Sequence, residues 1–346
     1  MKSTIIILTD YKGYFGSKWD AVPYRSGFNK LLLEKYFNVF NYKVKFVSIS
    51  DISTVGDVSG FNVLYTSSED IGYRYKSYIE DIVYALELKG AKMIPDYKHF
   101  RANNNKVFME LLRDVDGIST NLKSKVFGSI SDLEMHIDQV FFPCVFKTAE
   151  GSSGNGVALV KTKEELYKQV KESSSGQRNY KQDIRDHLRA LKHKGYIKES
   201  IYREKFIVQE FIPNLKNDWK IYVFGDKLYT FKRPIQKGRG IKASGGGYDN
   251  YLYGLDAEAP EGMFDLALEV FNKLHVAHLS IDIAYDGEQL YIIEFQSLYF
   301  GTAGIPYSKG YFSKKEGNWK FIEEKLEIEK VYADSIVQFL KKNSTS

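Results

Sequence analysis

The chain has 346 residues, of which 43% are hydrophobic and 15% aromatic, so it can build more than one hydrophobic core and is not globally disordered. No apolar run approaches the length of about 18 residues that a membrane span needs, and the N-terminus reaches the polar Asp10 too early for a signal peptide, so we expect a cytoplasmic protein. The single cysteine, Cys144, excludes an internal disulfide and a cysteine-rich metal site.

The first hundred residues alternate between strand and helix patterns. Apolar runs predict strands at 5–8, 43–49, 61–65 and 91–94, and helices at 26–37, with Ser26 as N-cap, and at 75–89, ended by Gly90. This alternation implies parallel pairing with crossover connections. We therefore expect an open parallel α/β domain at 1–100, with candidate substrate loops at 9–16 and 66–72, because ligands collect beyond the carboxyl ends of such strands.

A glycine-rich loop, residues 151–156, lies between two strand-like runs. Rossmann and Walker loops lead from a strand into a helix, whereas residues 157–160 predict a second strand here, and a helix begins only at the capping box Thr162-x-x-Glu165. With Lys147 on the incoming strand, this arrangement is typical of a lid over a nucleoside triphosphate. An ordinary hairpin with a flexible loop is the alternative. Upstream, a run of asparagines ending at Asn105 predicts the start of a helix at Lys106.

The net charge of +5 is concentrated in one segment. Residues 171–205 carry ten Lys or Arg and five Asp or Glu, so their surplus equals that of the whole chain. The segment combines a serine run with a helical pattern at 183–194, which indicates an exposed insertion. We favour a solvated basic helix over a nucleic-acid or membrane contact, and such a helix can also steer an anionic substrate.

From residue 206 the chain is mainly strand-like. Strands are predicted at 206–211, 219–224, 227–233, 280–284 and 290–296, and helices at 264–274 and 326–340. The first of these strands is either an ordinary core strand or a link between two lobes, on which an adenine would contact the backbone near Glu210 and Ile212. The cations Lys220, Arg233 and Arg239 follow on or just after the next hairpin and are either solvated or functional.

Three oxygen-bearing side chains, Asp282, Glu294 and Gln296, interrupt the last predicted hairpin. Buried carboxylates without partners are costly, so this set indicates a bound cation; the alternative is a polar face in water. A two-residue turn would put Asp282 and Glu294 on opposite faces. A three-residue loop at 286–288 instead pairs Asp282 with Ile292, and all three donors then share a face, with diagonal neighbours about 7–8 Å apart.

In this order the elements resemble the ATP-grasp superfamily, in which two α+β lobes hold ATP between them behind an open α/β domain. The resemblance covers residues 100–310, and the segment with Arg233-Pro234-Ile235 and Arg239-Gly240-Ile241-Lys242-Ala243-Ser244-Gly245-Gly246 is most similar to glutathione synthetase and the ribosomal-protein glutamate ligases. It implies a first lobe at 101–205, containing the lid and the insertion at 171–205, and a second lobe at 206–346.

The resemblance also implies roles for single residues. It implies ATP contacts at Lys106, Lys147, Glu150, Gly151, Ser152, Ser153, Gly154, Gly156, Gln209, Glu210, Phe211, Ile212 and Asp218. Asp282, Glu294 and Gln296 correspond to an Asp-Glu-Asn triad for one or two Mg²⁺ ions, or Mn²⁺, with Gln296 in place of the usual Asn. Arg233, Lys220 and Arg239 are the implied catalytic cations, and Arg233 would stabilise an acyl phosphate.

The activity that the resemblance implies is an ATP-dependent carboxylate–amine ligase, which forms an amide through an acyl phosphate and releases ADP and phosphate. Its small-molecule partners would be a carboxylate and an amine, and the substrate is an amino acid, a peptide or a sugar acid. A phosphotransferase with the same ATP site and a non-catalytic nucleotide-binding protein are the alternatives. A nucleic-acid partner rests on the basic insertion alone, and a homodimer is compatible with the sequence.

Overall fold

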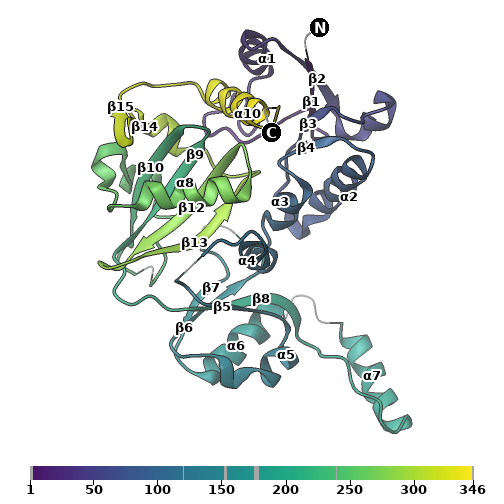
Figure 1. Cartoon of the computed structure of the whole chain (residues 1–346). Coiled ribbons are helices and arrows are strands. Elements are labelled where there is room, and N and C mark those ends of the chain that lie inside the picture. Colours follow the sequence, from purple (N-terminus) through teal and green to yellow (C-terminus); the bar gives the residue numbers. More distant parts are fainter. Residues whose placement is uncertain (1–2, 120, 152–153, 175–178, 239, 345–346) are drawn as a thin grey trace.

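The computed structural model describes residues 3–119, 121–151, 154–174, 179–238 and 240–344, which form three β-sheets with helices packed on them (Figure 1). Figure 1 places the large antiparallel sheet (green) beside the N-terminal region (purple and blue) and above a small antiparallel sheet (teal). Within the described part of the chain, none of the helices combines the length and apolar character that a bilayer crossing requires.

The N-terminal sheet is parallel, as the sequence predicts. Its strands, in the order β2-β1-β3-β4, are β1 Ser3–Thr9, β2 Tyr42–Ser48, β3 Asn62–Leu64 and β4 Lys92–Ile94. Its helices are α1 Lys30–Val39, α2 Arg74–Leu88 and α3 Tyr97–Ala102. Short 3₁₀ segments complete the described helical elements at Ile49–Val55, Ile71–Tyr73, Ile137–Gln139, Tyr248–Asn250 and Gly254–Ala257.

The predicted start of the first helix is wrong. Asn29, rather than Ser26, is the N-cap, and its side-chain oxygen accepts hydrogen bonds from the N–H groups of Leu31 and Leu32. The reason is Gly27, which has a φ of +81° and lies against the backbone of Phe15, where a Cβ would meet the carbonyl oxygen at 2.3 Å. A left-handed residue inside the predicted first turn prevents the helix from starting earlier.

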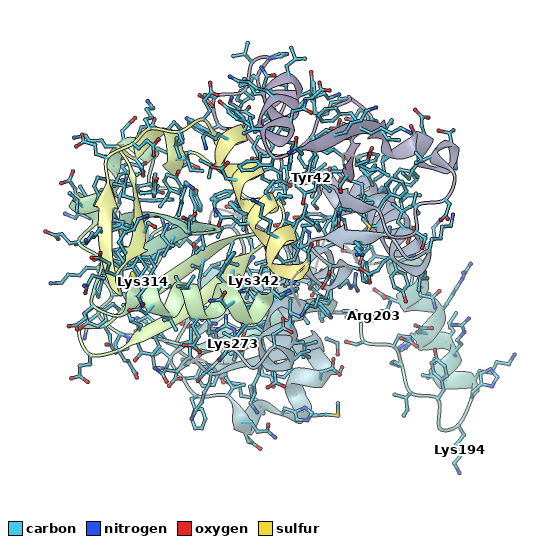
Figure 2. All side chains as sticks on the ribbon, turned by 45° about the horizontal axis from the view of Figure 1, so that its top comes forward. Tyr42, Lys194, Arg203, Lys273, Lys314 and Lys342 are labelled. Carbon is cyan, nitrogen blue, oxygen red and sulfur yellow. The ribbon has the colours of Figure 1, made fainter. Side chains whose placement is uncertain are left out.

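The small sheet has the order β5-β8-β6-β7 and is antiparallel. Its strands are β5 Ser124–Ser129, β6 Cys144–Thr148, β7 Val157–Val160 and β8 Arg203–Glu210, and its neighbouring helices are α4 Lys106–Val115, α5 Ile130–Met135 and α6 Lys163–Ser174. The glycine-rich loop joins β6 to β7, so the predicted strand–loop–strand arrangement is confirmed. Helix α7, Tyr180–Lys192, lies in the basic insertion and extends away from the body, with Lys194 near the far end (Figures 1 and 2).

The large sheet has the order β13-β12-β9-β10-β14-β15, and β11 pairs with β10. Its strands are β9 Asn217–Phe224, β10 Lys227–Pro234, β11 Leu252–Tyr253, β12 His278–Tyr285, β13 Leu290–Gln296, β14 Tyr311–Lys315 and β15 Asn318–Ile322. The remaining helices are α8 Met263–Leu274, α9 Gly304–Tyr307 and α10 Ile328–Ser344. One hydrophobic core includes residues from β1, β9, α1 and α10, which ties the N-terminal region to the large sheet.

The β12–β13 hairpin differs in register from the prediction. Tyr285 pairs with Leu290, which gives a four-residue connection, and Asp282 pairs directly with Glu294 rather than with Ile292. An even loop alone would put the two carboxylates on opposite faces, but the register shifts between Asp282 and Ile283, so Ile293 is the extra residue of a β-bulge. The bulge brings Asp282 and Glu294 to the same face, with Cβ atoms about 5 Å apart in such a direct pair.

Candidate active site

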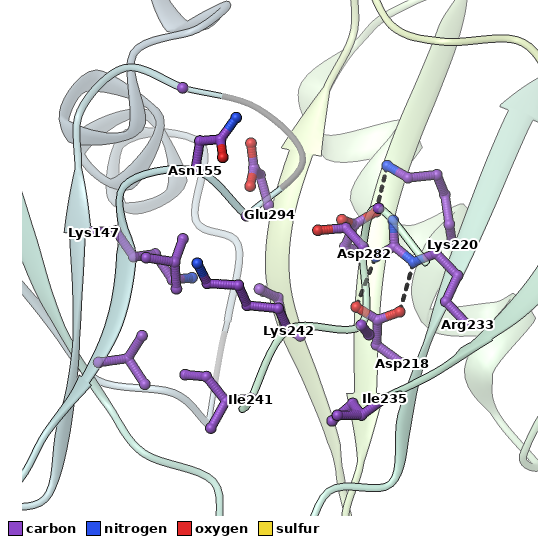
Figure 3. Close-up of a pocket in the computed structure, with 18 of the residues that line it drawn as sticks. Lys147, Asn155, Asp218, Lys220, Arg233, Ile235, Ile241, Lys242, Asp282 and Glu294 are labelled. Carbon is purple, nitrogen blue, oxygen red and sulfur yellow. Dashed lines mark hydrogen bonds and ion pairs between the residues drawn. The ribbon is translucent and has the colours of Figure 1, made fainter. Parts of the chain in front are cut away.

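A cleft of about 630 Å³ lies between the small and the large antiparallel sheets. One wall comes from β6, β8 and the glycine-rich loop, and the facing wall comes from β9, β10, β12 and β13. Figure 3 shows Lys147 on the first wall and the ion-pair network of Arg233 on the second, with the segment around Ile241 between them. Residues from the N-terminal region, among them Trp19 and Glu69, complete the lining.

Most of the residues predicted to contact a nucleotide line this cleft. They are Lys106, Lys147, Gly151, Gly154, Gln209, Glu210, Phe211, Ile212 and Asp218. The predicted catalytic residues Lys220 and Arg233 and the predicted metal ligands Asp282, Glu294 and Gln296 line it as well. Glu150 and Gly156 lie outside the lining, whereas Ser152, Ser153 and Arg239 lie outside the described residues.

Lys147 is a buried lysine at the centre of the first wall. Its Nζ donates to Oε1 of Gln209 on β8 at 2.6 Å. Burial lowers the pKa of Lys147 to about 8, although the nearby carboxylates Glu294 and Glu110 act in the opposite direction. Gln209 accepts one of the three hydrogens of the ammonium, so the group can still donate to an anion in the cleft.

Lys106 ties the start of α4 to the glycine-rich loop. Its backbone N–H donates to the carbonyl of Ala149, and its Nζ donates to the carbonyl of Gly151, each at 2.8 Å. The side-chain oxygen of Asn105 caps the helix by accepting from the N–H of Phe108 at 3.3 Å, as the asparagine run predicts. The loop is thereby anchored at its first glycine.

The glycine-rich loop contacts the segment after β10 that contains Lys242. Gly154 packs against the side chain of Lys242, where a Cβ would lie 3.1 Å from Cδ, and its φ is +77°. Gly156, with a φ of +73°, packs so tightly on Thr148 that a Cβ would lie 2.0 Å from Oγ1. A side chain at position 156 would clash with Thr148, so this conformation of the loop requires glycine there.

Arg233 is the centre of a buried ion-pair network on the second wall (Figure 3). Its Nε and Nη2 donate to the two oxygens of Asp218 at 2.6 and 2.7 Å, and Nη2 also donates to Oδ2 of Asp282 at 2.8 Å. Lys220 forms an ion pair with Oδ1 of Asp282 at 2.5 Å and donates to the hydroxyl of Ser280 at 3.1 Å. A bidentate pair of this kind holds the guanidinium in one orientation.

The network keeps Asp282 ionised. Burial alone would raise the pKa of its carboxyl, but Arg233 and Lys220 together outweigh burial and lower the pKa to about 2. The two carboxylates in turn raise the pKa of Arg233 well above its ordinary value, against the opposing effect of burial. Beside this network, the side-chain amide of Gln296 donates to Oε1 of Glu294 at 3.1 Å.

Comparison with known proteins identifies the fold. No family model matches the chain. It is 25% identical over 186 residues to formate-dependent phosphoribosylglycinamide formyltransferase of Prochlorococcus marinus, a match that covers 51% of this chain and only 45% of that relative.

Solved structures match over nearly the whole length. D-cycloserine synthetase DcsG is 11% identical, with 98% of this chain and 100% of that chain covered and a TM-score of 0.56. D-alanine–D-alanine ligase of Bacillus anthracis is 13% identical, with 99% of each chain covered and a TM-score of 0.53. A RimK domain ATP-grasp protein of Sphaerobacter thermophilus is 12% identical, with 96% of this chain and 99% of that chain covered and a TM-score of 0.52. The chain has the ATP-grasp fold.

The ATP-grasp fold implies Mg²⁺, an ion that proteins bind through oxygen ligands. Among the described residues, no three His, Cys, Asp or Glu side chains cluster as a ready-made metal site. Asp282 and Glu294 nevertheless face each other across β12 and β13, and Gln296 follows on the same face of β13. Mg²⁺ is commonly held by one or two carboxylates together with substrate phosphates, so two carboxylates and an amide oxygen fit the ion when nucleotide is present.

Arg113 is a functional candidate that the sequence reasoning missed. This buried residue of α4 donates to the carbonyls of Ile292 at 2.8 Å and of Ile293 at 3.3 Å, and it pairs with Glu110 at 3.2 Å. Burial lowers the pKa of the guanidinium, while Glu110 and Glu294 oppose this effect. Arg113 thus binds the β-bulge that orients Glu294. The signal was the spacing of Lys106, Glu110 and Arg113, which puts three charged residues on one helix face.

Trp19 and Arg25 were also missed, and Glu69 was predicted only as part of a candidate substrate loop. They lie on the connections that follow β1 and β3, at the carboxyl edge of the parallel sheet, and all three line the cleft. Glu69 falls within the predicted substrate loop 66–72, whereas Trp19 and Arg25 lie beyond the predicted loop 9–16. The first connection folds back on itself through the bridge of Phe15 with Gly27, and this pairing was not visible in the sequence pattern.

Proposed function

We propose that this ATP-grasp chain is an ATP-dependent ligase that joins a carboxylate to an amine and releases ADP and phosphate. The observation that carries the proposal is the cleft itself, in which the buried ammonium of Lys147 lies across from Arg233, a guanidinium fixed by two carboxylates. Preorganised cations on two sides of a cleft suit the charge that develops on a transferred phosphoryl group. Several proteins of this fold are named as ligases or synthetases.

The nucleotide would occupy the part of the cleft beside β8. Glu210, Phe211 and Ile212 line the cleft where β8 ends, and this position suits an adenine held by backbone groups and apolar side chains. Lys106 and Lys147 would then contact the phosphates. Because Lys106 now bonds the carbonyl of Gly151, phosphate binding would exchange this contact for one with the ligand.

The reaction would proceed in two displacements. An oxygen of the substrate carboxylate attacks the γ-phosphorus of ATP, the bond to the β,γ-bridging oxygen breaks, and ADP leaves with the electron pair. The neutral amine then attacks the acyl carbon, the bond from that carbon to the phosphate oxygen breaks, and phosphate leaves with the electron pair. The nitrogen finally gives up one proton to solvent, and an amide remains.

Arg233 would stabilise the acyl phosphate and the tetrahedral intermediate. Asp218 fixes its guanidinium from one side and Asp282 from another, so little reorganisation is needed when negative charge develops nearby. Gly154 and Lys242 bring the two loops that border the cleft into contact, and closure of these loops over bound ATP would limit hydrolysis of the acyl phosphate by water.

Asp282, Glu294 and Gln296 would hold Mg²⁺, which when bound supplies further neutralisation of the phosphate oxygens. Arg113 would act as a positioning residue for this set, since it holds the carbonyls next to Glu294.

The test is ADP release by the purified full-length chain across a matrix of carboxylates and amines, with Asp282→Asn as the matched variant. The proposal predicts ADP release that requires both partners and falls at least tenfold in the variant, since a metal ligand and a fixed partner of Arg233 are lost together. ADP release that needs no amine and yields a phosphorylated product would instead identify a phosphotransferase. Equal rates in both proteins would refute the metal assignment.

A further inference from the structure

The cleft has a third wall that the proposed ATP chemistry does not use. It comes from the N-terminal region and contains Trp19, Arg25 and Glu69, which lie on the two connections that leave the carboxyl edge of the parallel sheet. These residues share the cleft with Arg233 and Glu294. They therefore face the space in which a second substrate would meet an acyl phosphate.

The connection that carries Trp19 and Arg25 is anchored at several points. The backbone N–H of Trp19 donates to Oγ1 of Thr302 at 3.2 Å. The fully buried carboxylate of Glu329 on α10 accepts from Nζ of Lys18 at 2.9 Å and from the backbone N–H of Asn29 at 2.8 Å. A buried carboxylate that accepts hydrogen bonds at both ends of one segment holds that segment against α10. These contacts hold the segment in a position from which Trp19 and Arg25 line the cleft.

Trp19 joins this wall to the glycine-containing loop after β10. Its ring lies 4.6 Å from that of Tyr248, with an angle of 57° between the planes. Tyr248 directly follows Gly247 and contacts Tyr251 and Tyr307, whose rings lie 5.7 and 6.0 Å away. Aromatic faces from separate parts of the chain therefore border this end of the cleft and offer apolar contact to a ligand.

Arg25 and Glu69 put two opposite charges on this wall. Within the described part of the chain, neither residue belongs to any of the ion pairs. The guanidinium of Arg25 contacts the ring of Tyr24 at 5.3 Å, and Glu69 accepts one hydrogen bond from Asn104 at 3.3 Å. Both side chains are exposed. A ligand that filled this end of the cleft would displace water from both charges.

Arg25 and Glu69 both lie at distinct local backbone features. Arg25 has a φ of +63°, a left-handed conformation that an L-residue adopts only where the surrounding structure enforces it. Glu69 precedes Asp70, whose carboxylate caps α2 by accepting from the N–H groups of Tyr75 at 3.0 Å and Lys76 at 3.1 Å. Arg25 thus lies in a left-handed turn, and Glu69 lies beside a helix cap.

We propose that Arg25 and Glu69 form the subsite of the amine substrate and that this substrate is an amino acid in its zwitterionic form. This inference rests on the proposed ligase function. Arg25 would bind the free carboxylate, and Glu69 would bind the ammonium. The ammonium releases a proton to solvent before the neutral amine attacks, and the aromatic border would contact the side chain. Arg25 and Glu69 already act on each other electrostatically. A neutral sugar would add a charged partner for neither residue, and a simple amine would add one for Glu69 alone, whereas a zwitterion adds one for each.

The experiment compares free amino acids with their carboxamides, which retain the amine and lose the negative charge. ADP release is measured for each with the full-length chain, ATP and a mixture of carboxylates. Wild type should prefer a free amino acid by roughly tenfold or more, the value of one charge-assisted contact. Arg25→Met should remove this preference by raising KM for the free amino acid, with KM for ATP unchanged. Glu69→Gln should raise KM for both forms, and Lys35→Met, which removes an exposed cation on α1, should change nothing.

A second measurement separates this inference from the ligase proposal. Calorimetric binding of the same amino acids and carboxamides, in the presence of a non-hydrolysable ATP analogue, needs no turnover. Binding that depends on Arg25 without ADP release would support the subsite and overturn the ligase. ADP release with an unchanged preference for free amino acids in Arg25→Met would support the ligase and overturn the subsite. If no free amino acid binds better than its carboxamide, the subsite assignment is wrong.

Discussion

The ion pairs of Asp282 predict a specific dependence of stability on pH. Arg233 and Lys220 outweigh burial and lower the pKa of this carboxyl to about 2, against an ordinary value of 3.8. A carboxyl whose pKa is lower in the folded chain stabilises the fold above its ordinary pKa, and this contribution is lost as the pH falls towards the folded value. The shift corresponds to about 2 kcal/mol of unfolding free energy at pH 7, of which about half should remain at pH 3.

The Asp282→Asn variant measures this contribution directly. Its amide keeps the shape of the side chain but cannot ionise. Wild type should therefore be more stable than the variant by about 2 kcal/mol at pH 7 and by about 1 kcal/mol at pH 3. Urea unfolding between pH 7 and pH 3 in the presence of a chelator gives both values. Taking the difference between the two proteins removes the titration of all other carboxyls that the substitution does not disturb.

The matched control is Asp81→Asn, which removes an exposed carboxylate on α2. Its stability difference from wild type should stay within about 0.5 kcal/mol at every pH. A difference between wild type and Asp282→Asn that stayed constant from pH 7 to pH 3 would refute the view that the two cations hold this carboxylate in its charged form.

Three further substitutions test other parts of the cleft. Lys147→Met should weaken ATP binding at least tenfold at pH 7. In calorimetry, the affinity of wild type for ATP should fall as the pH rises through about 8, where Lys147 loses its proton, and the variant should show no such fall. The same fall in both proteins would count against the role of Lys147. Arg113→Met should lower the free energy of unfolding by about 3 kcal/mol, because the buried carboxylate of Glu110 loses its ion-pair partner and keeps only the hydrogen bond from Ser124, and two carbonyls lose a donor; a urea midpoint close to that of wild type would contradict this. Gln296→Asn should keep Mg²⁺-dependent ADP release within about threefold because an amide oxygen is retained, whereas Gln296→Leu should lose about tenfold; equal loss in both would exclude the amide oxygen as a ligand.

Much of the fold could be predicted from local pattern. The parallel strands β1 to β4, the strand–loop–strand arrangement around the glycines and the Asn cap of α4 all follow from residues that are neighbours in the sequence. The shift in the start of α1 could not be predicted this way. It depends on Gly27 packing against Phe15, a contact that forms only after the first connection folds back.

The candidate site was likewise predictable only where residues close together in the sequence determine it. Asp282 and Glu294 stood out as carboxylates within apolar strands, and the structure brings them together. Their register depends on a bulge at Ile293, whose carbonyl accepts from Arg113 on a distant helix. No pattern within the hairpin encodes that contact, so the sequence predicted a shared face for the wrong geometric reason.

The most direct test of the central claim is chemical trapping of the acyl phosphate. Hydroxylamine added to the full-length chain with ATP, Mg²⁺ and a mixture of carboxylates should yield a hydroxamate in amounts that follow ADP release, because an activated acyl group reacts with this strong nucleophile in place of the natural amine. The account predicts hydroxamate that requires ATP and is lost in Asp282→Asn. ADP release that requires a carboxylate and never yields hydroxamate would contradict it.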